Sequence, residues 1–76
     1  MKAILEFNLP EDNGDHNICV KAFAMYATLR EMDEWLRGKI KYGHEYKTID
    51  EALVAVRDEL RELLTSNAID LENLNQ

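Results

Sequence analysis

The chain has 76 residues and a mass of 8.8 kDa, with 15 acidic and nine basic side chains, a net charge of −6 and a single cysteine. This length accommodates one domain, residues 1–76, and no more. A single cysteine excludes an internal disulfide framework, and the acidic balance argues against general binding of DNA or RNA. Because there is no apolar run long enough to span a bilayer and no secretory pattern, we expect a cytoplasmic protein without a membrane partner.

The first predicted element is a β-strand at residues 2–9. Its apolar side chains alternate with polar ones and fall on one face, which comprises Ala3, Leu5, Phe7 and Leu9. A period of two that stops at Pro10 is typical of a strand. Because a single strand cannot satisfy its own backbone groups, we expect it to pair with the same strand of a second copy.

A long helix is predicted at residues 16–42, with Asp15 as its N-cap and Gly43 as its stop. Apolar side chains recur at steps of three and four residues and form a stripe expected to face the core, comprising Ile18, Ala22, Met25, Leu29, Met32 and Leu36. The first half of this helix is also apolar away from the stripe. One short partner helix cannot cover so much apolar surface, which is a second reason to expect association between chains.

A second helix is predicted at residues 49–66. Thr48 and Glu51 have the spacing of a capping box at its start, and Asn67 is expected to end it in a left-handed conformation. Its core-facing stripe comprises Ile49, Leu53, Val56, Leu60 and Leu63. The remainder, residues 68–76, is expected to be a flexible tail whose apolar side chains pack back or fray, namely Ile69, Leu71 and Leu74.

These elements predict a mainly α fold, in which a short N-terminal β-strand precedes an antiparallel helical hairpin. The hairpin follows from the short connection between the helices. We expect the chain to assemble as a homodimer or a larger homo-oligomer, with strands pairing and helices bundling between chains, because one copy has too little core.

A local concentration of charge and aromatic rings marks residues 35–47. This segment has four basic residues and one acidic residue, a charge of +3, so the rest of the chain carries −9. Cations bind phosphate oxygens and flat rings stack on bases. The candidate ligand-binding residues are Arg30, Trp35, Arg37, Lys39, Lys41, Tyr42, His44, Tyr46 and Lys47. The alternative interpretation is a helix end whose lysines complement the helix dipole, with the rings in the hairpin core.

Within this set, each residue type has an expected role. The cations expected to hold phosphate are Arg37, Lys39, Lys41 and Lys47. The stacking ring is expected to come from Tyr42, Tyr46 or Trp35, and His44 is expected to donate a hydrogen bond.

Two carboxylate pairs, Glu31-x-x-Glu34 and Glu59-x-x-Glu62, resemble the magnesium-binding pattern of the all-α nucleotide pyrophosphohydrolases. The predicted stripes direct most of these carboxylates outward, and that family's last acid is aspartate, so a magnesium-dependent hydrolase is a lesser alternative. His16 and Cys19 have zinc-ligand spacing but lack partners, so we expect Cys19 to be buried and inert. We therefore expect no catalytic residue, no metal and no cofactor.

Two segments, MKAILEFNLPED at residues 1–12 and LRGKIKYG at residues 36–43, resemble a group of small phage-encoded proteins. Those proteins share an MKA-L-F-LPED start and an LR-IKY segment. The resemblance covers about half of the chain and implies an origin and a location in the infected cell, but it assigns no functional residue.

Together these observations predict a non-enzymatic phage accessory protein. It would bind and sequester a small phosphate-bearing ligand, with a nucleotide immune signal as the favoured case, and so counter host defence. The alternative is a protein-binding inhibitor that docks on a host factor through an acidic or apolar surface; outward carboxylates that imitate DNA phosphates are a further, minor option.

Overall fold

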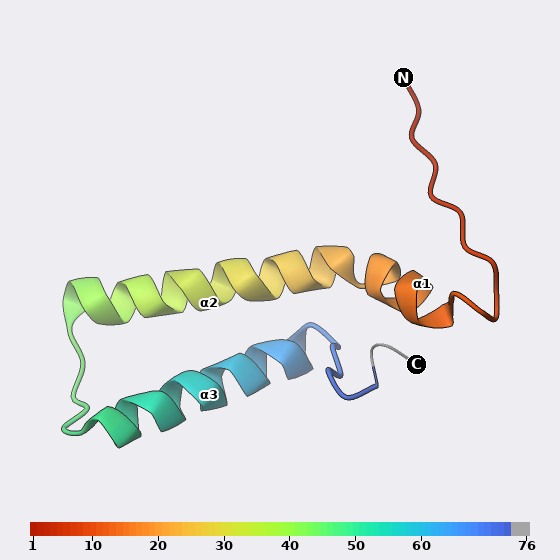
Figure 1. Ribbon diagram of the computed structural model, residues 1–76. Helices are drawn as coiled ribbons and strands as arrows, with labels where there is room; N and C mark the ends of the chain where they lie inside the picture. The colour runs from red at the N-terminus through yellow and green to blue at the C-terminus, as the bar shows by residue number, and fades with distance from the viewer. Residues whose placement is uncertain (74–76) are drawn as a thin grey trace.

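The computed structural model describes residues 1–73, which form three helices: α1 (Asn13–Val20), α2 (Ala22–Tyr42) and α3 (Ile49–Ser66). Helices α2 and α3 lie antiparallel, and α1 lies beyond the N-terminal end of α2 (Figure 1). The predicted mainly α fold and helical hairpin are therefore confirmed. Within residues 1–73, no helix is both long enough and apolar enough to cross a membrane.

The predicted β-strand at residues 2–9 is wrong, because residues 1–73 contain no strand. This segment is extended, and Figure 1 shows it standing away from the hairpin. Ile4 and Leu5 are exposed, whereas the Phe7 ring packs edge-on against His16 with centroids 5.3 Å apart. A strand needs a neighbour for its backbone groups, and the described part of the chain offers none.

A tight turn joins this segment to α1. The Asn8 N–H donates to Asp12 Oδ2 at 2.8 Å, and the Asp12 N–H donates to the Asn8 carbonyl at 2.8 Å. Helix α1 consequently begins at Asn13, before the predicted start at residue 16, with Asp12 at the N-cap position and Asp15 in the first turn. The predicted N-cap at Asp15 is wrong because the turn brings the chain into helical geometry earlier.

The single helix predicted at residues 16–42 is two helices. Lys21, with φ −90° and ψ 1°, separates them. Backbone bonding continues across the break: the Lys21 N–H donates to the Asn17 carbonyl at 3.1 Å, and the Lys21 carbonyl accepts from Met25 at 2.9 Å. Because no glycine or proline stands at this position, the apolar pattern gave no local signal for the break.

The face of α2 that contacts α3 differs from the predicted stripe at its centre, whereas Met25, Met32 and Leu36 of that stripe are half-buried. Thr28 is 3% exposed, whereas the adjacent Leu29 is 70% exposed. On α3, Ile49 and Leu53 are also exposed. The predicted core is therefore wrong at Leu29, Ile49 and Leu53. It is also wrong at Ile18 and Ala22, which are exposed. Two features explain which face of α2 is covered. Helix α2 has more apolar surface than α3 can cover, so part of it stays exposed. The covered part is set by a polar contact, in which Asn67 Nδ2 donates to Thr28 Oγ1 at 2.8 Å.

Helix α3 ends in a Schellman motif. The Ile69 N–H donates to the Leu64 carbonyl at 2.9 Å, and the Ala68 N–H donates to the Thr65 carbonyl at 3.1 Å. Ala68 has the positive φ of 57°, so the left-handed conformation predicted for Asn67 lies one residue later. Ile69 is 6% exposed, so the tail packs back there, whereas Leu71 is exposed. Leu74 lies outside the described residues.

Candidate functional site

The connection between α2 and α3 is fixed by local hydrogen bonds at both of its ends. Gly43 ends α2 with φ 88°, and its N–H donates to the Lys39 carbonyl at 3.0 Å. At the start of α3, Thr48 Oγ1 accepts from the Glu51 N–H at 3.1 Å, and Glu51 Oε2 accepts from the Lys47 N–H at 2.8 Å. The predicted stop at Gly43 and the predicted capping box are confirmed, and together they fix the two ends of the loop.

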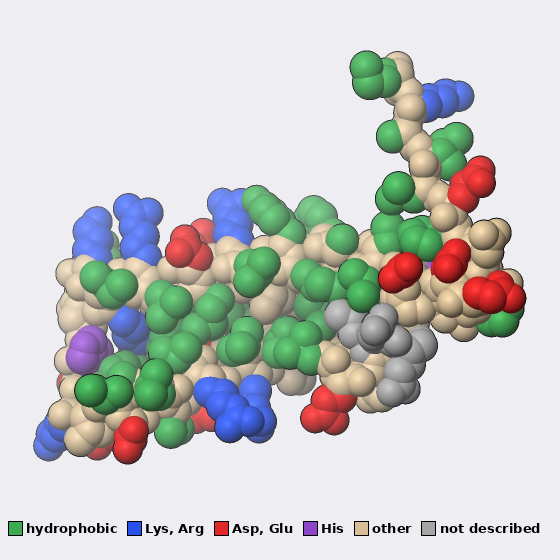
Figure 2. Space-filling view, in the orientation of Figure 1, with side chains coloured by type: hydrophobic (Ala, Val, Ile, Leu, Met, Phe, Trp, Pro, Cys, Tyr) green, Lys and Arg blue, Asp and Glu red, His purple; other side chains and the backbone are tan. Residues whose placement is uncertain are grey.

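A pocket of about 540 Å³ lies between this loop and the two helices. Its volume is within the range of small-molecule sites. The lining combines three aromatic rings, one cation and several apolar side chains, contributed by Trp35, Leu36, Lys39, Ile40, Gly43, His44, Tyr46, Ala52 and Val56. In Figure 2 the imidazole of a histidine is visible at the loop end of the hairpin, beside apolar side chains.

The ammonium group of Lys39 lies over two rings of the pocket. Lys39 Nζ is 5.4 Å from the centroid of the Trp35 ring and 5.8 Å from the centroid of the Tyr46 ring. A cation over an aromatic face is attracted by the ring quadrupole, so one positive charge is held by two aromatic rings. Trp35 and Lys39 are one helical turn apart on α2, which is why both face the loop.

His44 and Tyr46 stack on each other in the loop. Their ring centroids are 5.0 Å apart with an angle of 24° between the planes. The Tyr46 N–H donates to His44 Nδ1 at 3.3 Å. Because Nδ1 accepts in this bond, Nε2 carries the ring proton and is a hydrogen-bond donor for a ligand.

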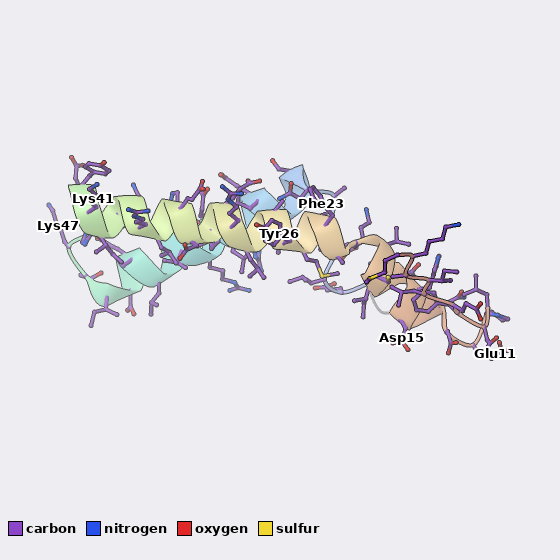
Figure 3. All side chains as sticks on the ribbon, turned by 90° about the horizontal axis from the view of Figure 1, so that it is seen from above. Glu11, Asp15, Phe23, Tyr26, Lys41 and Lys47 are labelled. Atoms are coloured by element: carbon purple, nitrogen blue, oxygen red, sulfur yellow. The ribbon has the colours of Figure 1, made fainter. Side chains whose placement is uncertain are left out.

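The structure brings four of the nine predicted site residues into one pocket: Trp35, Lys39, His44 and Tyr46. The others lie outside its lining. Arg30 Nε is 3.4 Å from Glu34 Oε1 in an exposed ion pair, and Lys41 Nζ lies 5.3 Å from the centroid of the Tyr42 ring. Arg37 and Lys47 are exposed, and Figure 3 shows Lys41 on α2 and Lys47 in the loop at the same end of the hairpin.

Sequence reasoning missed the apolar half of the pocket. Leu36 and Val56 were assigned to the core, and Ile40, Gly43 and Ala52 were given no role in the site. The available signal was spacing, because Leu36 and Ile40, like Ala52 and Val56, are four residues apart on their helices. That spacing identifies residues on one face but does not say which face borders the loop.

The carboxylates do not form a metal centre in residues 1–73. No group of three or more His, Cys, Asp or Glu side chains in that range is placed to hold a metal ion. Glu31, Glu34 and Glu62 are exposed, and Glu59 is half-buried. Cys19 is a free, half-buried thiol.

The pocket therefore offers flat aromatic faces, the cation of Lys39 and the imidazole of His44 as a hydrogen-bond donor. This combination suits binding of a planar ring that carries an anionic group. Comparison of the chain with protein-family models, curated proteins and solved structures finds no match.

Proposed function

We propose that this protein captures a small phosphate-bearing ligand of the nucleotide class in the pocket at the loop end of the hairpin. The observation that carries the proposal is the position of Lys39 Nζ over the rings of both Trp35 and Tyr46. Lys39 would contact the phosphate, a ring of the pocket would stack on the base, and His44 Nε2 would donate a hydrogen bond.

The proposed action is sequestration, without a chemical step. Among the described residues, the pocket lining contains no carboxylate, cysteine or serine, and its one histidine, His44, is assigned a role in ligand binding. In the setting implied by the resemblance to phage-encoded proteins, the ligand is a nucleotide immune signal in the cytoplasm of an infected cell. Its capture would counter host defence.

Titration calorimetry with AMP and cyclic di-AMP tests the proposal, with adenosine and inorganic phosphate as the separate parts of the ligand. We expect at least one nucleotide to bind more tightly than either part alone, because ring and phosphate are held by different groups. Absence of binding by both nucleotides would overturn the proposal.

Two matched pairs of variants locate the binding. Lys39→Met retains the aliphatic stem and removes the charge, so we expect nucleotide affinity to fall roughly tenfold or more. Lys41→Met, two residues away and outside the pocket lining, should leave affinity unchanged. In the same way Tyr46→Leu should weaken binding, whereas Tyr42→Leu should not. Equal effects within either pair would place the ligand elsewhere.

A separate assay distinguishes capture from hydrolysis. After incubation with magnesium, the nucleotide released by denaturing the protein should be intact. Product formation that is abolished by Glu31→Gln and Glu59→Gln would instead favour the pyrophosphohydrolase alternative.

A further inference from the structure

One side of the hairpin is apolar along most of its length. On α2, Leu29, Leu36 and Ile40 are separated by seven and four residues and therefore share a face. On α3, the residues that share a face by the same spacing are Ile49, Leu53, Leu60 and Leu64. Figure 2 shows apolar side chains continuing from α2 across to α3 on this side of the molecule. We call these seven residues the apolar face.

Several members of the apolar face are left exposed in the single chain. Leu29, Ile40, Ile49 and Leu53 are all among the exposed large hydrophobic residues. Among residues 1–73, Ile69 is the only hydrophobic side chain classed as buried. The hairpin consequently lacks a second layer against which its helices can pack, although domains are normally built from two.

We propose that the apolar face is the interface of a homodimer, in which two hairpins pack face to face as a four-helix bundle. This inference does not rest on the proposed ligand. It keeps the bundling of helices between chains that the sequence predicts, drops the pairing of strands that the described residues do not form, and adds the face and the arrangement of the two hairpins.

The exposed area supports a second copy as the occupant. The chain has an accessible surface of 6651 Å², against about 4,800 Å² for a compact protein of this mass. Its radius of gyration is 16.6 Å, against about 11 Å for a compact domain of this length. Extended residues at the N-terminus account for part of this excess. The excess as a whole, about 1,850 Å², is more than twice the roughly 800 Å² that each partner contributes to a stable interface.

The distribution of charge favours an antiparallel arrangement of the two hairpins. The loop end carries the basic segment, residues 35–47, and the opposite end carries acidic side chains of the N-terminal turn, α1 and the tail: Glu11, Asp12, Asp15, Asp70 and Glu72. Figure 3 shows Lys41 and Lys47 at one end of the molecule and Glu11 and Asp15 at the other. When the two-fold axis is perpendicular to the helices, the basic end of each hairpin lies beside the acidic end of its partner. In a parallel arrangement the two basic ends would lie beside each other and repel.

The test compares two neighbouring residues of α3. Leu53 and Val54 are 61% and 59% exposed, but only Leu53 belongs to the apolar face. Sedimentation equilibrium of the wild-type chain should give the mass of a dimer. Leu53→Lys should weaken dimerisation roughly a hundredfold or more, because a two-fold interface contains the substitution twice. Val54→Lys should leave the dimer intact.

Leu29→Lys on α2 provides a second variant, since it alters the same face from the other helix. Circular dichroism of each variant checks that the helices persist. If a variant loses its helices, the wild-type protein still decides the question, because its melting temperature should rise with protein concentration only if the folded state is associated. Added salt should weaken the dimer, and tightening with salt would overturn the antiparallel arrangement.

Three results would overturn the interface. The first is a wild-type protein with the mass of one chain, which would leave the apolar face for a different protein. The second is a dimer whose stability changes with neither Leu53→Lys nor Leu29→Lys. The third is a loss of dimerisation with Val54→Lys as large as that with Leu53→Lys. Neither Leu53 nor Leu29 lines the pocket. Leu36 and Ile40 belong to both the apolar face and the pocket lining, so the interface borders the pocket. Substitutions at Leu53 and Leu29 therefore test dimerisation without altering the pocket lining, and substitutions at Lys39 and Tyr46 test nucleotide binding without altering the apolar face.

Discussion

The hydroxyl group of Thr28 connects α2 to the end of α3. It donates to the Ala24 carbonyl at 2.9 Å and accepts from Asn67 Nδ2 at 2.8 Å, so both its donor and its acceptor capacities are used. Thr28 is the buried residue of α2, and Asn67 is the C-cap residue of α3. This contact fixes how far along α2 the second helix extends and which side of α2 it faces.

Substituting Thr28 by valine should therefore destabilise the hairpin. Valine keeps the shape but removes the acceptor of the Asn67 amide, which we expect to lower the free energy of unfolding by about 1–2 kcal/mol. Urea denaturation at one fixed protein concentration measures this change. Thr28→Ser keeps the hydroxyl and is the control. In a double-mutant cycle with Asn67→Ala, strictly additive effects would show that the two side chains do not interact.

The glycines at positions 38 and 43 should respond to alanine in opposite directions. A Cβ on Gly38 meets no atom within 4 Å, and this residue lies inside α2, so Gly38→Ala should raise the free energy of unfolding by about 0.5–1 kcal/mol. Gly43 has φ 88° and ψ 175°, a conformation that alanine adopts only with strain, so Gly43→Ala should cost about 1–3 kcal/mol. Chemical denaturation of both variants gives the comparison, and a shift of the same sign in both would contradict it.

Substituting Ala68 by glycine should stabilise the protein. The φ of 57° that Ala68 has at the end of α3 is unfavourable for any residue with a Cβ. Ala68→Gly removes that strain and restores the usual residue of a Schellman motif, so we expect a gain of about 0.5–1 kcal/mol, measured as a higher urea midpoint. The same change at Ala55, inside α3, should instead destabilise by about 1 kcal/mol. Loss of stability at both positions would show that Ala68 carries no strain.

The pKa of the Asp70 carboxyl should show whether the turn at the start of the tail is formed in solution. The hydrogen bond from the Asn73 side chain, together with backbone N–H groups of Glu72 and Asn73, lowers this pKa from the ordinary 3.8. A lowered pKa means that the ionised form favours the folded turn. This contribution is present above pH 3.8 and is lost as the pH falls through the pKa of the folded state.

Carbon-detected NMR of the Asp70 carboxyl measures this pKa directly. Asn73→Ala removes the largest cause and should move the titration midpoint upward, toward the ordinary value. An unchanged midpoint in Asn73→Ala would show that the side-chain hydrogen bond does not form in solution.

Much of the local structure was predictable because its causes lie within a few residues. The stop at Gly43 depends on one backbone conformation, and the start of α3 depends on hydrogen bonds among Lys47, Thr48 and Glu51. The break at Lys21 and the early start of α1 were not predicted. The first has no glycine or proline to mark it, and the second depends on the turn closed by Asn8 and Asp12.

The sequence predicted where the candidate site lies along the chain, but not which side chains face each other in it. The charge and the rings of residues 35–47 identified the loop end of the hairpin. Whether Lys39 or Lys41 faces the rings depends on the rotation of α2 relative to α3, and a difference of two residues on a helix corresponds to about 200°. The apolar members of the pocket come from both helices and depend on the same rotation.

By itself, the sequence determined that this chain forms two main helices, where the loop between them begins and ends, and that positive charge and aromatic rings concentrate there. Each of these properties follows from side chains close together along the chain. Only the tertiary structure decided that Thr28 is buried and Leu29 is exposed, that residues 2–9 form no strand, and that an apolar face is left open. The physical reason is that α2 is apolar on more than one side, so its own pattern does not choose which side α3 covers.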